Sequence, residues 1–218
     1  MRLIIAALLL IGILATTFNN LPTNPSSNKV DEFDYYVLSL SWLPSWCAID
    51  GDARGADQCD PKHDFGWTLH GLWPEFERGY PSYCKTSERA PSRDQTAGMV
   101  DIMGSSKLAQ HEWEKHGTCS GLSAQDYFAA SRRAYEAVIR PPLLRKLDHT
   151  VKMPAYVIEE AFLKSNPSWD ANMITITCRQ QRIQEARLCL TKDLTPRKCG
   201  PDVLLDCNTN FAIVDPVR

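Results

Sequence analysis

The sequence lacks the excess of positive charge that marks a protein binding nucleic acid over its whole surface. Its 24 Lys and Arg residues are outnumbered by 26 Asp and Glu residues, which gives a formal charge of −2. Any binding of nucleic acid must therefore come from a local site rather than from the field of the whole protein. Hydrophobic residues make up 44% and charged residues 23% of the chain. This ordinary balance excludes a disordered chain, a collagen and a coiled coil.

The apolar run near the N-terminus is too short to span a membrane. It covers residues 3–15, which is 13 residues, whereas a spanning helix needs about 20. It follows Arg2 and precedes small residues, as the apolar region of a secretory signal peptide does. We expect a signal peptide over residues 1–17, with an approximate cleavage site, and a flexible lead-in over residues 18–32. A permanent N-terminal anchor is the alternative.

Closely spaced cysteine pairs of the C-x2-C type are absent, and so are N-x-S/T glycosylation acceptors. Zinc binding by cysteines is therefore disfavoured, and the even number of cysteines predicts four disulfides in an oxidising compartment. Spacing alone leaves their pairing open. We expect an exported protein, periplasmic or extracellular. The eight cysteines are Cys47, Cys59, Cys84, Cys119, Cys178, Cys189, Cys199 and Cys207.

The region that follows the lead-in, residues 33–218, has the length of one domain. Period-two alternation at both of its ends predicts strands, and helical patterns lie between them. The order predicts an α+β fold, with a central antiparallel sheet and several helices packed against it. Strands are expected over residues 34–43, 65–69, 172–178 and 183–190, the last two as a hairpin. Helices are expected over residues 106–116, 123–140 and 154–164, and residues 47–63 are expected to be a loop.

Two segments carry chemically active side chains. The first, WTLHGLWP at residues 67–74, places His70 where the second predicted strand ends, so a rigid element would hold it. Trp67 and Trp73 can equally be core residues. The second, HEWEKHGTC at residues 111–119, begins on a predicted helix.

The helical spacing of the second segment brings its polar side chains together. Glu112 and His116 are four residues apart, as are His111 and Lys115, so each pair meets on the helix surface. We expect Glu112 to accept a hydrogen bond from His116, and the helix dipole to favour the protonated form of His116. His111 and Lys115 would hold an anion. A solvated helix with salt bridges is the alternative.

His111-Glu112 also begins like the zinc motif H-E-x-x-H, which needs its second histidine four residues after the first. Position 115 is Lys, and His116 is five residues away. The two imidazoles then point roughly 140° apart around the helix. We therefore expect no metal site and no cofactor.

WTLHGLWP and HEWEKHGTC resemble the two signature segments of the ribonuclease T2 family, the secreted and vacuolar endoribonucleases of broad base preference. Residues 33–47 are similar to the first strand of that family and residues 185–199 to its last core hairpin, so the resemblance spans most of residues 33–207. It implies cleavage of single-stranded RNA by its own 2′-OH, which leaves 2′,3′-cyclic phosphate ends. In that reaction His70 would be the general acid, His116 the general base, and Glu112 a support for the pentacovalent phosphate.

The resemblance also implies a substrate-binding set. Lys115 would stabilise the phosphate, His111 would bind it, and Trp73 would pack on the catalytic histidine or on the substrate. Plant members have Gln where this chain has Ser41, so base preference is not carried over. The disulfides that the resemblance implies are Cys47–Cys59, Cys84–Cys119, Cys178–Cys207 and Cys189–Cys199.

RNA is the expected partner, because DNA lacks the attacking 2′-OH and should not be cleaved. We expect a monomer with no membrane attachment once the signal peptide is removed. The alternative function is that of a catalytically silent member of the same fold, which binds RNA or a protein.

Overall fold

The computed structural model describes residues 30 and 32–218. The predicted signal peptide lies outside the described residues, as does the predicted lead-in except for its residues 30 and 32. In the described part, no helix has the length and apolar character needed to cross a membrane.

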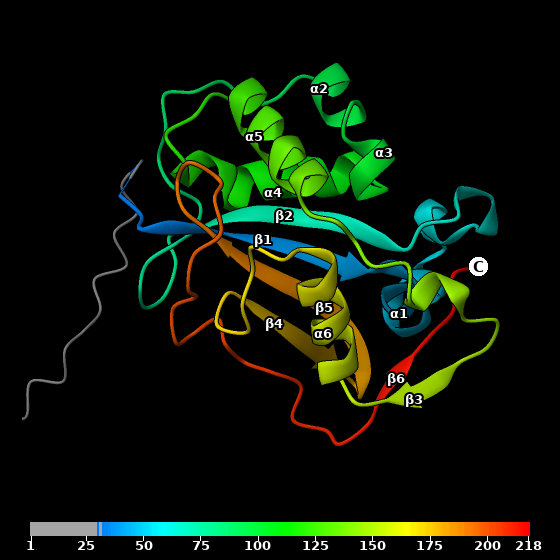
Figure 1. The fold of residues 1–218 in the computed structure, drawn as a ribbon. Helices are drawn as coiled ribbons and strands as arrows, with labels where there is room; N and C mark the ends of the chain where they lie inside the picture. The colour runs from blue at the N-terminus through cyan, green and yellow to red at the C-terminus, as the bar shows by residue number, and fades with distance from the viewer. Residues whose placement is uncertain (1–29, 31) are drawn as a thin grey trace, which may run out of the picture.

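The described residues form one six-stranded sheet in the order β2-β1-β5-β6-β3, with β4 also paired to β5 (Figure 1). The pairings are antiparallel, as predicted, except for a short parallel contact between β5 and β6. The four predicted strands correspond to β1, β2, β4 and β5. The strands β3 and β6 were not predicted, because three residues are too few to show an alternation. The strands are β1 Tyr35–Trp42, β2 Trp67–Glu75, β3 Val151–Met153, β4 Ile174–Arg179, β5 Arg182–Leu190 and β6 Ala212–Val214.

The three predicted helices are present as α4 Ser106–Lys115, α5 Ala124–Ala137 and α6 Tyr156–Ser165. Serines begin the first two, because the Oγ of Ser105 and of Ser123 each accept an orphan backbone N–H of the first turn. The predicted loop at residues 47–63 is wrong in part, since it consists of short helical turns that follow α1 Leu43–Trp46. Two further short helices are α2 Arg93–Ala97 and α3 Val100–Met103.

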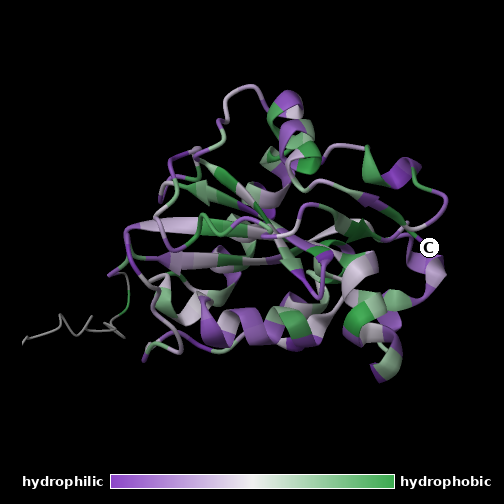
Figure 2. Cartoon of the chain, turned by 90° about the horizontal axis from the view of Figure 1, so that it is seen from below, coloured by the Kyte–Doolittle hydropathy of each residue, from purple (hydrophilic) through white to green (hydrophobic). Residues whose placement is uncertain are grey.

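The hydrophobic core lies between the sheet and its helices. Helices α2 to α5 gather beside β2, and α6 packs on β4 (Figure 1). One face of β1 enters this core, where Leu38, Leu40 and Trp42 are wholly buried. In Figure 2 the central strands carry many of the hydrophobic residues, and the outer helices and loops carry the hydrophilic ones. The opposite face of β1 presents Tyr35 and Val37 to a smaller cluster.

The disulfide pairing implied by the resemblance is confirmed. The bonds are Cys47–Cys59, Cys84–Cys119, Cys178–Cys207 and Cys189–Cys199. The second of these joins the loop after β2 to the turn that follows α4.

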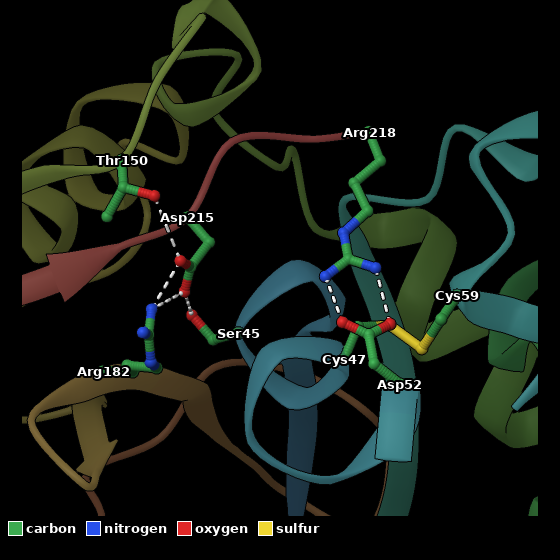
Figure 3. Close-up of polar contacts among 8 residues, drawn as sticks. All are labelled: Ser45, Cys47, Asp52, Cys59, Thr150, Arg182, Asp215 and Arg218. Carbon is green, nitrogen blue, oxygen red and sulfur yellow. Dashed lines mark hydrogen bonds and ion pairs between the residues drawn. A yellow bond between two sulfur atoms is a disulfide. The ribbon is translucent and has the colours of Figure 1, made fainter. Parts of the chain in front are cut away.

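Ion pairs fasten the C-terminal segment to the sheet and to the turns after α1 (Figure 3). The carboxylate of Asp215 accepts from Arg182, Ser45 and Thr150. Arg218 forms a two-pronged pair with Asp52, at 2.6 and 2.5 Å. The chain end is thus tied to β5, to α1 and to the turn that follows α1.

Candidate active site

His70 lies inside a strand and not at its end, which corrects the predicted boundary. β2 continues to Glu75, but its pairing with β1 shifts at His70: Ser39 lies opposite Gly71, and Leu40 lies opposite Leu69. His70 is therefore the extra residue of a β-bulge, a feature that redirects side chains. The bulge breaks the alternation that predicted the strand.

The bulge changes which side chains of β2 share a face. Leu69 and Leu72, three residues apart, both enter the core. His70 and Trp73 face a cavity of about 460 Å³ on the other side of the strand. The structure brings together all six predicted site residues around this cavity. They are His70, Trp73, His111, Glu112, Lys115 and His116.

Trp73 lies between the two histidines of the predicted acid-base pair. The ring of His116 stacks on the indole with a centroid distance of 5.2 Å and an interplanar angle of 23°. The ring of His70 meets the same indole edge-on at 5.2 Å and 78°. The indole thus spaces the two imidazoles within one cavity.

Glu112 does not bind His116, which corrects the prediction from helical spacing. Its carboxylate accepts a hydrogen bond of 2.7 Å from Nε1 of Trp73 and lies 3.6 Å from Nε2 of His70. The backbone N–H of His116 still donates to the Glu112 carbonyl at 2.9 Å, but the Glu112 side chain turns to Trp73 and His70 on β2. Burial raises the pKa of the Glu112 carboxyl, while the charge of His70 and the indole N–H oppose that shift.

His116 is held in its neutral form. Only 3% of the residue is exposed, and within the described structure its Nδ1 has no hydrogen-bond partner. Burial lowers the pKa of His116 far below its usual value, and the positive charges of Lys115, His70 and His111 add to that effect. The net shift is therefore opposite to the one expected from the helix dipole alone.

His70 shifts in the opposite direction because of a residue that the sequence reasoning missed. Its Nδ1 lies 2.5 Å from Oε1 of Glu185 on β5. Burial alone would lower the pKa of His70, but the hydrogen bond and charge of Glu185, with the charge of Glu112, raise it overall. Glu185 in turn pairs with Arg187 at 2.8 Å. The available signal was a pair of opposite charges two residues apart in a strand that was predicted to lie in the sheet.

Further polar groups line the same cavity. Tyr80 is half-exposed, and its ring lies 5.9 Å from Nζ of Lys115. Glu75 is 7% exposed, and burial raises the pKa of its carboxyl to about 8. Among the described residues, no group of three or more His, Cys, Asp or Glu side chains has the arrangement of a metal site.

The fold and the cavity define an α+β protein, cross-linked by disulfides, in which two histidines of opposite electrostatic bias flank one tryptophan. The chain belongs to the Ribonuclease T2 family, whose sequence profile matches residues 33–199. That span includes the two signature segments and the hairpin of Glu185.

The chain is also similar to two curated bacterial proteins. It is 46% identical over 102 residues to a ribonuclease of Aeromonas hydrophila, a match that covers 47% of this chain and 45% of that protein. It is 38% identical over 120 residues to a probable ribonuclease of Haemophilus influenzae, covering 50% of this chain and 44% of that protein. The matched part thus spans about half the length of these relatives.

The fold is that of solved structures as well. An RNase-related protein from Calystegia sepium superposes with a TM-score of 0.66 and 19% sequence identity. The superposition covers 84% of this chain and 99% of that protein. At this identity the likeness establishes the fold.

Proposed function

We propose that this chain is an endoribonuclease that cleaves single-stranded RNA and leaves 2′,3′-cyclic phosphate ends. One observation carries the proposal: His70 and His116 face one cavity on the two sides of Trp73, with pKa values shifted in opposite directions. A pair biased in this way supplies a proton donor and a proton acceptor at the same pH. Membership in the family supports the same activity.

In the proposed reaction His116 acts as the general base. Its neutral imidazole takes the proton of the ribose 2′-OH as O2′ forms a bond to phosphorus. His70 begins protonated and donates a proton to O5′ as the bond between phosphorus and O5′ breaks. The products are a 2′,3′-cyclic phosphate and a free 5′-OH, and the two histidines have exchanged protonation states.

The negative charge of the pentacovalent phosphate is met by side chains of α4. Lys115 and His111 line the cavity beside His116, and we assign them to the phosphate oxygens. Glu112, held by the indole of Trp73, faces Nε2 of His70 and favours the protonated form of that ring. Since protein side chains fill every role in this scheme, we propose that cleavage needs no metal ion.

We further propose that residues 33–218 form the catalytic domain of an exported, monomeric protein. The four disulfides that tie this region together support export, because such bonds persist in oxidising compartments. We propose that the exported protein resides in the periplasm or in the surrounding medium.

The experiment uses a short RNA and the same strand with one 2′-deoxyribose. We expect cleavage of the RNA in the presence of EDTA, cyclic phosphate ends in the product, and no cut at the deoxy position. His70→Ala and His116→Ala should each lose at least about 10²-fold in rate. The matched control is His149→Ala, whose side chain is 75% exposed and pairs with Asp148.

Full activity in either active-site variant would refute the assignment of the two histidines. Binding of RNA without any cleavage by the wild-type chain would instead favour the catalytically silent alternative.

A further inference from the structure

Glu185 reaches His70 across a strand that lies between them. In the sheet β1 is the neighbour of both β2 and β5, so His70 and Glu185 are not on adjacent strands. Their side chains nevertheless meet at 2.5 Å between Nδ1 and Oε1. The contact needs a redirected side chain on β2, which the bulge at His70 provides.

The intervening strand leaves room for this contact. Ser41 of β1 pairs with Glu185, and Ser39 pairs with Arg187. On the face of the sheet that Glu185 and Arg187 share, β1 therefore carries only small side chains opposite them. Ser39 is wholly buried, and its Oγ has no hydrogen-bond partner in the described structure. A larger residue at either serine would stand between the two strands.

The carboxylate oxygen of Glu185 that does not contact His70 is bound by Arg187. Only 1% of the Glu185 side chain is exposed, and its second oxygen accepts from Arg187 at 2.9 Å (Nε) and 2.8 Å (Nη2). Arg187 also lies over Trp73, 5.3 Å from the ring centroid. A buried carboxylate bound on both oxygens by charged donors stays ionised and has one orientation.

We propose that Glu185 is a positioning residue that fixes the orientation and tautomer of His70. The inference rests on the proposed function, in which His70 is the general acid. With Nδ1–H donated to Glu185, the proton that His70 exchanges with the leaving oxygen is the one on Nε2. That atom is on the Glu112 side of the ring. The arrangement follows the general logic of a carboxylate that orients a catalytic imidazole.

The charges that face His70 come from two elements. Glu185 and Arg187 lie on β5, and Glu112 lies on α4. Glu185 and Glu112 raise the pKa of His70, whereas Arg187 lowers it. The two β5 residues therefore act on His70 in opposite directions, and a general loss of stability would not reproduce that pattern.

The test measures the pKa of His70 by NMR of histidine-labelled protein, and in parallel the pH dependence of kcat/KM on a short RNA. In Glu185→Gln we expect the pKa of His70 to fall by about 1–3 units, the range for loss of an adjacent opposite charge. Because a general acid must carry its proton, the alkaline limb of activity should move to lower pH by the same amount. KM should change less than kcat.

Two further variants complete the test. Arg187→Gln, at a side chain that is 27% exposed, should shift both readings to higher pH. Glu77→Gln, which removes an exposed carboxylate paired with Arg197, should leave both readings unchanged. The NMR signal of His70 is assigned by its loss in His70→Ala.

An unchanged pKa of His70 in a folded Glu185→Gln protein would overturn the inference. If that variant does not fold, Glu185→Asp, which draws the carboxylate back from Nδ1 of His70, is titrated in its place, and an unchanged pKa of His70 then overturns the inference. If the wild-type chain does not cleave RNA, the proposed function fails, and the NMR titration still decides whether Glu185 controls His70.

Discussion

Nε1 of Trp73 donates a hydrogen bond of 2.7 Å to Oε2 of Glu112, which joins β2 to α4 at the centre of the cavity. Glu112 is 2% exposed, so the indole N–H supplies a hydrogen bond that water cannot readily provide. The two signature segments of the sequence meet through this contact. Its loss would affect both the stability of the fold and the spacing of the two histidines.

Trp73→Phe keeps an aromatic ring and removes the donor. We expect a loss of about 1–3 kcal/mol in the free energy of unfolding, because a buried charged acceptor loses its partner. A double-mutant cycle with Glu112→Leu, which removes the acceptor, isolates the contact when measured by urea unfolding. A coupling energy near zero would show that the bond contributes nothing to stability.

Gly71 gives the Glu112 carboxylate access to the backbone of β2. A Cβ at this position would lie 2.0 Å from Oε2 of Glu112 and 2.5 Å from Nε1 of Trp73. We expect Gly71→Ala to cost about 1–3 kcal/mol, the scale for overpacking a core, and to reduce RNA cleavage. Urea unfolding and cleavage assays measure the two effects. Gly98→Ala is the control, since its nearest neighbour would be 3.3 Å away, and equal effects in both variants would contradict this reading.

Glu75 should make stability depend on pH in a defined window. Burial raises the pKa of its carboxyl from 4.5 to about 8 in the folded chain. The folded state therefore retains a proton that the unfolded chain has released, and the contribution of Glu75 to stability falls as pH rises from about 4.5 to about 8. Glu75→Gln removes this fall. Between pH 4 and pH 9 the variant should gain up to about 5 kcal/mol relative to the wild-type chain.

Urea unfolding of both proteins at several pH values measures that difference. A constant difference across the window would show that Glu75 has an ordinary pKa in the folded protein.

The disulfide Cys84–Cys119 should support activity as well as stability. Cys119 is three residues beyond His116, and its partner lies in the loop after β2, 35 residues earlier. We expect Cys84→Ala/Cys119→Ala to lose about 2–5 kcal/mol in stability and to cleave RNA more slowly even where it is folded. Thermal unfolding and cleavage assays are the measurements. The control, Cys47→Ala/Cys59→Ala, removes a bond beside α1 and should affect stability alone.

Much of the site could be predicted from spacing within short segments. The two signature segments contain the six predicted side chains, and the structure brings all of these to the cavity. The alternation over residues 34–43 likewise predicted the strand β1, because successive side chains of a strand point to opposite faces. These are local properties, and the local sequence determines them.

The contacts between segments could not be predicted in the same way. Helical spacing paired Glu112 with His116, whereas the folded chain pairs Glu112 with Trp73, which is 39 residues earlier. The partner lies on β2, so spacing within α4 could not reveal it. The bulge at His70 likewise depends on the register of two strands and not on either strand alone.

The sequence by itself therefore determined the family, most of the strands and helices that carry the site, and six of the side chains that line it. Only the tertiary structure decided which neighbouring side chains set the protonation of each histidine. Glu185 is 115 residues from His70 in the chain, and the protonation of His70 and of His116 depends on burial and on charges from other elements. Burial and through-space charge arise only when distant segments pack, so no pattern within one segment contains them.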